Sequence, residues 1–175
     1  PKSTDQRIVI ELVTEAPQIV TPTGLGVDAK GRVIVIESHT HFRPKDYKGP
    51  ERDRLLMFTM DAKGKAKRSI FYKGLKMGMD VCIGKNGWVY LAERSRILRV
   101  RDTNNDGKAD KTEDIITLKT TGTYPHNGLS GLSFDLKGNL IFGLGENFQK
   151  EWTLTASDGT KVKGTGEGGI FRCRP

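Results

Sequence analysis

The sequence predicts an all-β fold, namely a β-propeller built from four-stranded antiparallel blades. One pattern occurs three times: an apolar strand, a turn that contains glycine, and a second apolar strand that ends near a glutamate. The copies begin at Gly24, Gly78 and Gly131, so their starts lie 54 and then 53 residues apart. A fixed period in this range indicates a repeat architecture. No segment shows sustained i, i+3, i+4 apolar spacing, so no helix is expected.

Residues 1–20 are expected to lead into the first blade. Arg7–Val13 is rich in β-branched and apolar residues and predicts one strand, which would end before Ala16-Pro17.

The first blade is predicted at about residues 21–76. Its second strand, Val33–Ile36, is continuously apolar, as in a strand that is buried on both faces. Two further strands are expected at Arg54–Met60 and Lys67–Tyr72, joined by a turn over Asp61–Lys65. Four strands in about 50 residues make one propeller blade.

Two more blades are predicted at about residues 77–122 and 123–175. The second repeats the order of the first, with outer strands at Arg96–Arg101 and Asp114–Leu118. The third shows two strands, a long loop and a third strand at Gly169–Cys173. Since a propeller needs roughly 4 to 8 blades to close, we expect about three blades here, as the N-terminal part of a larger domain.

Composition narrows the class of protein. Hydrophobic residues make up 35% and charged residues 29% of the 175 residues, which predicts a globular domain with a real core. No apolar run reaches the roughly 20 residues that a membrane helix needs. The net charge is +8, but basic and acidic residues are interspersed and no nucleic-acid motif accompanies them. A solvated basic surface is therefore favoured over nucleic-acid binding.

The two cysteines, Cys82 and Cys173, lie on predicted strands of different repeats. Their spacing does not match a metal site. Buried free thiols are favoured over a disulfide.

Loops can be sorted by the face of the propeller on which they lie. Loops between the second and third strands of a blade, and those between blades, share one face; this face would carry residues 37–53, 119–128 and 146–168. Residues 102–113 would lie on the other face. Long loops on a rigid scaffold usually carry the function, so the first face is the candidate site.

The turn at residues 102–113 resembles a calcium loop in its spacing. Oxygen-bearing side chains stand at positions 1, 3, 5, 9 and 12, with glycine at position 6. The matching turn of the first blade has one carboxylate, so the second blade carries acids that its fold does not need. A structural calcium site is predicted; the alternative is an acidic hairpin without metal. The predicted metal residues are Asp102, Asn104, Asp106, Lys108, Asp110 and Glu113.

The three histidines fall on loops of the candidate face. Because Glu37, His39 and His41 alternate, their side chains would point the same way in an extended segment. They could hold a transition metal or bind a polar ligand; equally, the histidines could cap backbone groups. His126 precedes the innermost strand of the third blade, near the central channel, where a histidine can serve as a general base.

Glutamates follow the second strand of each copy, at Glu37, Glu93 and Glu146. A ring of carboxylates there could bind a cation or a polar substrate, or could accept hydrogen bonds from arginines and loop amides. The predicted pocket residues of this face are Glu37, His39, His41, Arg43, Glu93, Asn127, Glu146 and Asn147.

The segment Thr153–Val162 predicts a small hairpin with a Ser-Asp-Gly turn, followed by the glycine-rich stretch Gly164–Gly169. This region could be a flexible lid or a long surface loop.

Three stretches carry a resemblance to a known family: Ile36–Pro44, Asp102–Asp110 and Gly166–Pro175. They resemble the membrane-bound dehydrogenase-like family of planctomycetes and related bacteria, over nearly the whole chain from about Leu12. In that family an N-terminal propeller is often followed by helical repeats and a c-type cytochrome domain. The propeller is similar to the soluble quinoprotein glucose and sorbosone dehydrogenases, which are six-bladed and use pyrroloquinoline quinone.

The resemblance implies an exported protein, periplasmic or on the cell surface, that oxidises a sugar or alcohol with a quinone or cytochrome acceptor. His126 matches the histidine that takes the substrate proton in the quinoprotein enzymes. The implied partners are a c-type cytochrome domain or further propeller blades. Two alternatives stay open: a non-catalytic propeller that binds carbohydrate or protein, and a metal-dependent, lactonase-like hydrolase.

Overall fold

The computed structural model describes residues 4–41, 43–123, 128–147 and 149–175. Within these ranges all regular secondary structure is β-strand, apart from a single 3₁₀ turn at Lys85–Gly87. All strand pairs are antiparallel. The all-β propeller fold that the sequence predicts is thus confirmed.

The first sheet is a four-stranded blade whose strands follow chain order. Its strands are β1 (Pro22–Val27), β2 (Val33–Glu37), β3 (Asp53–Met60) and β4 (Ala66–Leu75). The alternation of apolar strands with short turns predicted this sheet to within a few residues.

The second sheet has six strands instead of the predicted four. Four of them were expected: β5 (Gly78–Ile83), β6 (Val89–Glu93), β7 (Arg96–Arg101) and β8 (Lys111–Thr120). The other two form a hairpin from the third repeat, β11 (Glu151–Ala156) and β12 (Lys161–Thr165). This is the hairpin predicted at Thr153–Val162, but β11 pairs along β8, so that the hairpin extends the second sheet outward.

The third sheet has the order β13-β10-β9. Its strands are β9 (Leu129–Phe134), β10 (Leu140–Leu144) and β13 (Gly169–Cys173). The pairing of β13 with β10 places Cys173 opposite Leu140 and Gly169 opposite Leu144.

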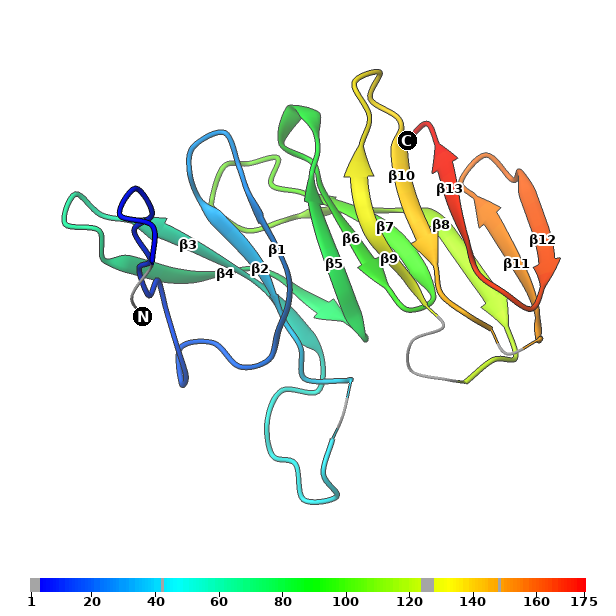
Figure 1. The fold of residues 1–175 in the computed structure, drawn as a ribbon, viewed down its shortest axis with the longest axis horizontal. Coiled ribbons are helices and arrows are strands. Elements are labelled where there is room, and N and C mark those ends of the chain that lie inside the picture. The colour runs from blue at the N-terminus through cyan, green and yellow to red at the C-terminus, as the bar shows by residue number, and fades with distance from the viewer. Residues whose placement is uncertain (1–3, 42, 124–127, 148) are drawn as a thin grey trace.

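The innermost strands of the three sheets lie side by side, β1 against β5 and β5 against β9 (Figure 1). At the first contact a Cβ on Gly24 would lie 2.7 Å from the Cα of Asp80, so only glycine lets the two backbones approach this closely. At the second, the Leu132 amide donates to Asp80 Oδ2 at 2.6 Å.

The two larger core clusters lie between successive sheets. One cluster between the first two sheets includes Ile34, Leu55 and Leu98; the next, between the second and third, includes Leu129 and Trp152. Cys82 and Cys173 are free thiols, as predicted, but they are partly rather than fully buried. Both pack against the second cluster, and their partial burial raises the pKa of each thiol.

The strand predicted at Arg7–Val13 is wrong, because these residues form no strand in the structure. Their apolar side chains are exposed, Val9 at 79% and Leu12 at 68%. High β propensity does not create a strand unless a neighbouring edge pairs with it. None of the described sheets pairs with this segment.

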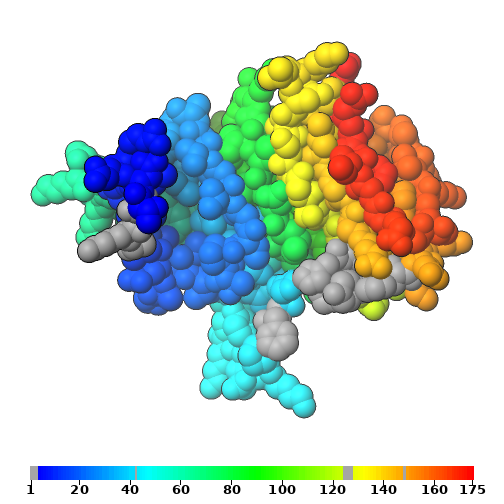
Figure 2. Space-filling model, viewed as in Figure 1, coloured from blue at the N-terminus to red at the C-terminus, as the bar shows by residue number. Residues whose placement is uncertain are grey.

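The described loops lie on the two faces to which the strand order assigns them. In Figure 1 the β2–β3 connection and the start of the β10–β11 connection lie at one end of the strands, and the β7–β8 connection, residues 102–110, lies at the other. The described residues of the segment 38–52, namely 38–41 and 43–52, project from the body as an arm (Figure 2). None of the described residues forms a helix that is long and apolar enough to cross a membrane.

Candidate functional site

The arm at residues 38–52 is an insertion into an otherwise repeated hairpin. Glu37 pairs with Arg54 across β2 and β3, and Glu93 pairs with Arg96 across β6 and β7. In the second sheet only residues 94 and 95 separate the pair, whereas in the first the whole arm lies between. The first blade therefore carries a loop that its hairpin does not require.

Glu37 is buried and anchors the base of the arm. Its Oε1 accepts from the Val20 amide at 3.2 Å, and its Oε2 accepts from Arg54 Nε at 2.7 Å and from His39 Nε2 at 3.0 Å. Burial disfavours the charged form, but the bonds from His39 and Arg54 outweigh it and lower the pKa of the carboxyl. The carboxylate is ionised and fully engaged.

Glu93 has the same supports in the second sheet. It accepts from the Lys76 amide at 2.9 Å and from Arg96 Nε at 2.7 Å, and this bond is the main reason that the pKa of Arg96 is raised. Glu146 lies two residues beyond β10 and is exposed, and Leu144 is the last residue of that strand. The three glutamates therefore do not occupy equivalent positions, and the two buried ones are held by arginines and amides.

His39 is buried with both ring nitrogens bonded. Nε2 contacts Glu37, and Nδ1 lies 2.5 Å from the hydroxyl of Tyr47. The backbone amide of His39 donates to Asp53 Oδ1 at 2.5 Å. His41 is exposed, because the chain bends directly after β2 rather than continuing as an extended strand. The predicted same-side grouping of His39 and His41 is thus not formed.

Asp53 is a buried residue of this site that sequence reasoning missed. Its Oδ2 accepts from Thr40 Oγ1 and from the Gly78 amide, both at 2.8 Å. With the bond from His39, this carboxylate ties the arm to the start of the second sheet. A carboxylate at the first position of β3, two residues before the apolar run that begins at Leu55, was the available signal.

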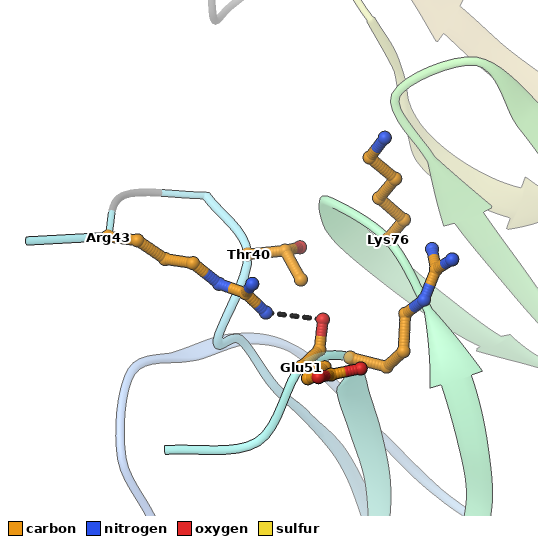
Figure 3. Close-up of a pocket in the computed structure, with 5 residues that line it drawn as sticks. Thr40, Arg43, Glu51 and Lys76 are labelled. Atoms are coloured by element: carbon orange, nitrogen blue, oxygen red, sulfur yellow. Dashed lines mark hydrogen bonds between the residues drawn. The ribbon is translucent and has the colours of Figure 1, made fainter. Parts of the chain in front are cut away.

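A basic cavity of about 350 Å³ opens between the arm and the β4–β5 connection (Figure 3). Arg43 extends within the arm toward the Glu51 backbone, and Lys76 comes from the β4–β5 connection. The lining residues are Thr40, Arg43, Glu51, Arg52 and Lys76. Three cations and one carboxylate favour an anionic ligand. Of the predicted pocket residues, Arg43 lies here.

The remaining predicted pocket residues lie elsewhere or are not described. Asn147 is buried. Its side-chain Oδ1 accepts from Thr120 Oγ1 at 3.2 Å, and its backbone N–H donates to the Gly166 carbonyl at 3.2 Å. It braces the β10–β11 connection against β8. His126 and Asn127 fall outside the described residues.

The predicted calcium loop folds as a series of local turns. Asp102 Oδ2 accepts from the Gly107 amide at 2.9 Å, and Asp106 Oδ1 accepts from the Lys108 amide at 2.8 Å. Hydrogen bonds from Thr103 lower the pKa of Asp110. One observation fits a cation: Asp102 Oδ1 is buried without a hydrogen-bond partner.

The last predicted ligand is paired with two cations, one on its own strand and one on the neighbouring strand. Glu113 lies on β8, where it contacts Lys111 Nζ at 2.9 Å and Arg99 Nη2 at 2.6 Å. These two cations lower the pKa of its carboxyl. Across the described ranges, no three His, Cys, Asp or Glu side chains are grouped as a metal site would require.

Solved structures with a similar fold include the holo form of the PQQ domain of pyranose dehydrogenase from Coprinopsis cinerea. It has a TM-score of 0.59 and 13% identity, over 83% of this chain and 35% of that one. A catalytically inactive virginiamycin B lyase from Staphylococcus aureus, solved with quinupristin, has a TM-score of 0.46 and 18% sequence identity. The match covers 85% of this chain and 42% of that one. A streptogramin B lyase has a TM-score of 0.49 and 13% sequence identity, and the match covers 87% of this chain and 43% of that one.

At 13% identity the similarity to the pyranose dehydrogenase domain shows the propeller fold alone, and the chain spans about a third of that domain. No curated protein matches the chain. A family model described as "Domain of unknown function (DUF7133)" matches residues 3–175. Since this match covers nearly every residue, the chain belongs to the DUF7133 family.

Proposed function

We propose that this chain is part of a dehydrogenase-like propeller that oxidises a sugar or alcohol and passes the electrons to a quinone or a cytochrome. The observation that carries the proposal is the basic cavity on the face that bears the long loops. The shared fold with a PQQ domain supports it. The proposal includes export to the periplasm or cell surface, and a c-type cytochrome domain or further blades as partners.

The cavity suits the chemistry of pyrroloquinoline quinone, which carries three carboxylates on a flat ring system. Arginine and lysine are the side chains that pair with carboxylates, so Arg43, Arg52 and Lys76 would hold these groups. When bound, the quinone supplies a two-electron acceptor. His39 does not take the substrate proton, because Glu37 and Tyr47 already engage both of its ring nitrogens. In this proposal that role belongs to His126.

A non-catalytic propeller that binds an acidic carbohydrate or protein is the second candidate. It is favoured by the bonding of Glu37, His39 and Glu93, each of which is engaged by neighbouring groups in the structure. The lactonase-like hydrolase has no supporting observation in the described part of the chain.

The test is titration of the full-length protein with pyrroloquinoline quinone, followed by fluorescence and by dye-linked oxidation of sugars. Each charge-assisted hydrogen bond contributes about 1.5–3 kcal/mol, so the double variant Arg52→Ala/Lys76→Ala should bind roughly 100-fold more weakly or worse. The matched control, Lys63→Ala/Lys137→Ala, removes two charges from the β3–β4 and β9–β10 turns and should bind like the wild type. Equal affinity for the two double variants would refute the cavity as the quinone site. Binding without sugar oxidation would favour the non-catalytic candidate.

A further inference from the structure

A chain of hydrogen-bonded side chains contacts Arg43, one of the residues that line the basic cavity. It runs from Glu37 through His39 to Tyr47, and Arg43 lies over the Tyr47 ring. We propose that Tyr47 and His39 are positioning residues that hold the Arg43 guanidinium ready for a carboxylate ligand. This inference rests on the anion site of the proposed function and adds to it the device that orders its arginine.

The direction of the hydrogen bonds follows from the chemistry of the groups. The Glu37 carboxylate can only accept, so His39 Nε2 carries the proton of the 3.0 Å bond. In the neutral imidazole, Nδ1 then accepts from the Tyr47 hydroxyl at 2.5 Å. Arg54, bonded to the same oxygen of Glu37 at 2.7 Å, fixes the carboxylate itself. Each member of the chain is thus oriented by the one before it.

Tyr47 and His39 together determine where Arg43 lies. The guanidinium carbon is 5.5 Å from the centre of the Tyr47 ring, and Arg43 Nε donates to the His39 carbonyl at 2.7 Å. Arg43 Nη2 also donates to the carbonyls of Pro50, at 3.0 Å, and Glu51. Within the described residues these bonds use Nε and Nη2, which leaves Nη1 for a ligand.

Gly49 makes room for the phenol. A Cβ at this position would lie 2.1 Å from the Tyr47 hydroxyl oxygen, closer than any real contact. Only a residue without a side chain therefore allows Tyr47 to reach His39. Gly49 thus leaves the space that this hydrogen bond needs.

The second sheet shows that a strand-end glutamate does not need an imidazole. Glu93 has the same two supports as Glu37, a main-chain amide and the cross-strand arginine, and the residue two positions later is Ser95 rather than histidine. The His39 bond is thus an addition in the blade that carries the arm. Because the Arg43 side chain is already ordered, binding does not have to immobilise it, and the affinity for the ligand is about 2- to 12-fold higher.

The experiment is calorimetric titration of the full-length protein with citrate, a tricarboxylate probe that is independent of quinone chemistry. We expect Arg43→Ala to weaken binding most and Tyr47→Phe to weaken it about 2- to 12-fold. His39→Ala should act like Tyr47→Phe. His39→Gln should retain near wild-type affinity, because its amide N–H can donate to Glu37 and its carbonyl can accept from Tyr47. Thermal midpoints of all variants show whether each one folds.

A double-mutant cycle separates positioning of Arg43 from a general structural effect. If Tyr47 acts through Arg43, Tyr47→Phe costs nothing further in the Arg43→Ala background. An unchanged affinity of folded Tyr47→Phe, or an equal loss in both backgrounds, would overturn the inference. Citrate binding that depends on Arg43 without any quinone binding would refute the proposed function alone. Failure of the wild type to bind citrate would overturn the anion site and this inference together.

Discussion

Asp53 is predicted to be the residue of the arm whose loss destabilises the fold most. It is fully buried and accepts hydrogen bonds from the His39 amide, the Gly78 amide and the Thr40 hydroxyl. In Asp53→Ala the Thr40 hydroxyl can turn to solvent, but the two amides belong to buried residues. Each buried donor without a partner costs about 1–3 kcal/mol, so the expected loss in the free energy of unfolding is about 2–6 kcal/mol.

The matched control is Asp61→Ala in the β3–β4 turn. Asp61 is exposed, and among the described residues its carboxylate accepts only from the nearby amides of Lys63 and Lys65, at 2.8 Å each. Its loss should cost no more than about 1 kcal/mol, since water replaces the carboxylate.

Thermal and urea unfolding of both variants measures the difference. For a domain of this size about 1 kcal/mol lowers the midpoint by roughly 2–4 °C, so Asp53→Ala should melt about 4–24 °C below the wild type. A midpoint no lower than that of Asp61→Ala would show that the arm is not tied to the second sheet through this carboxylate.

Two further predictions concern pH and calcium. Because the pKa of Glu37 is lower in the folded state than its usual 4.5, its ionic contacts stabilise the fold above about pH 4.5 and this contribution is lost as the pH falls through the folded pKa. The midpoint difference between wild type and Glu37→Gln should therefore shrink from pH 6 to pH 3; a constant difference would contradict this. If residues 102–113 bind calcium, the ion at about 100 times its Kd should add roughly 2.7 kcal/mol to the stability of the wild type and nothing to that of Asp106→Ala. Glu113 would have to leave Arg99 to join such a site. An unmoved wild-type midpoint in millimolar calcium would eliminate the site.

The repeated strands and their turns could be predicted from the sequence because their signals are local. The apolar run at β2 and the turn at Asp61–Lys65 appear in the structure within a few residues of the predicted bounds. The faces of the long loops also follow from strand order alone. Arg43 could be placed in the candidate site for the same reason, since it lies in the long β2–β3 connection.

The grouping of side chains could not be predicted, because it depends on bends and on neighbouring sheets. His39 turns inward and His41 outward where the chain bends after β2. Lys76 reaches the cavity from the next connection between sheets. For Glu37 and Glu93 the sequence left a ligand role and hydrogen bonding by arginines both open, and the structure shows each bonded to the arginine on the neighbouring strand.

The sequence by itself determined the repeat, the order of the strands in the first blade and the face on which the long loops lie, since these follow from apolar periodicity and turn residues. Only the tertiary structure decided which edges pair. The hairpin β11–β12 extends the second sheet because Trp152 and Leu154 bury their side chains in the core beside β8. The apolar residues at Arg7–Val13 have the propensity for a strand but no partner among the described sheets. Pairing is a property of two segments, and one segment of sequence cannot specify its neighbour.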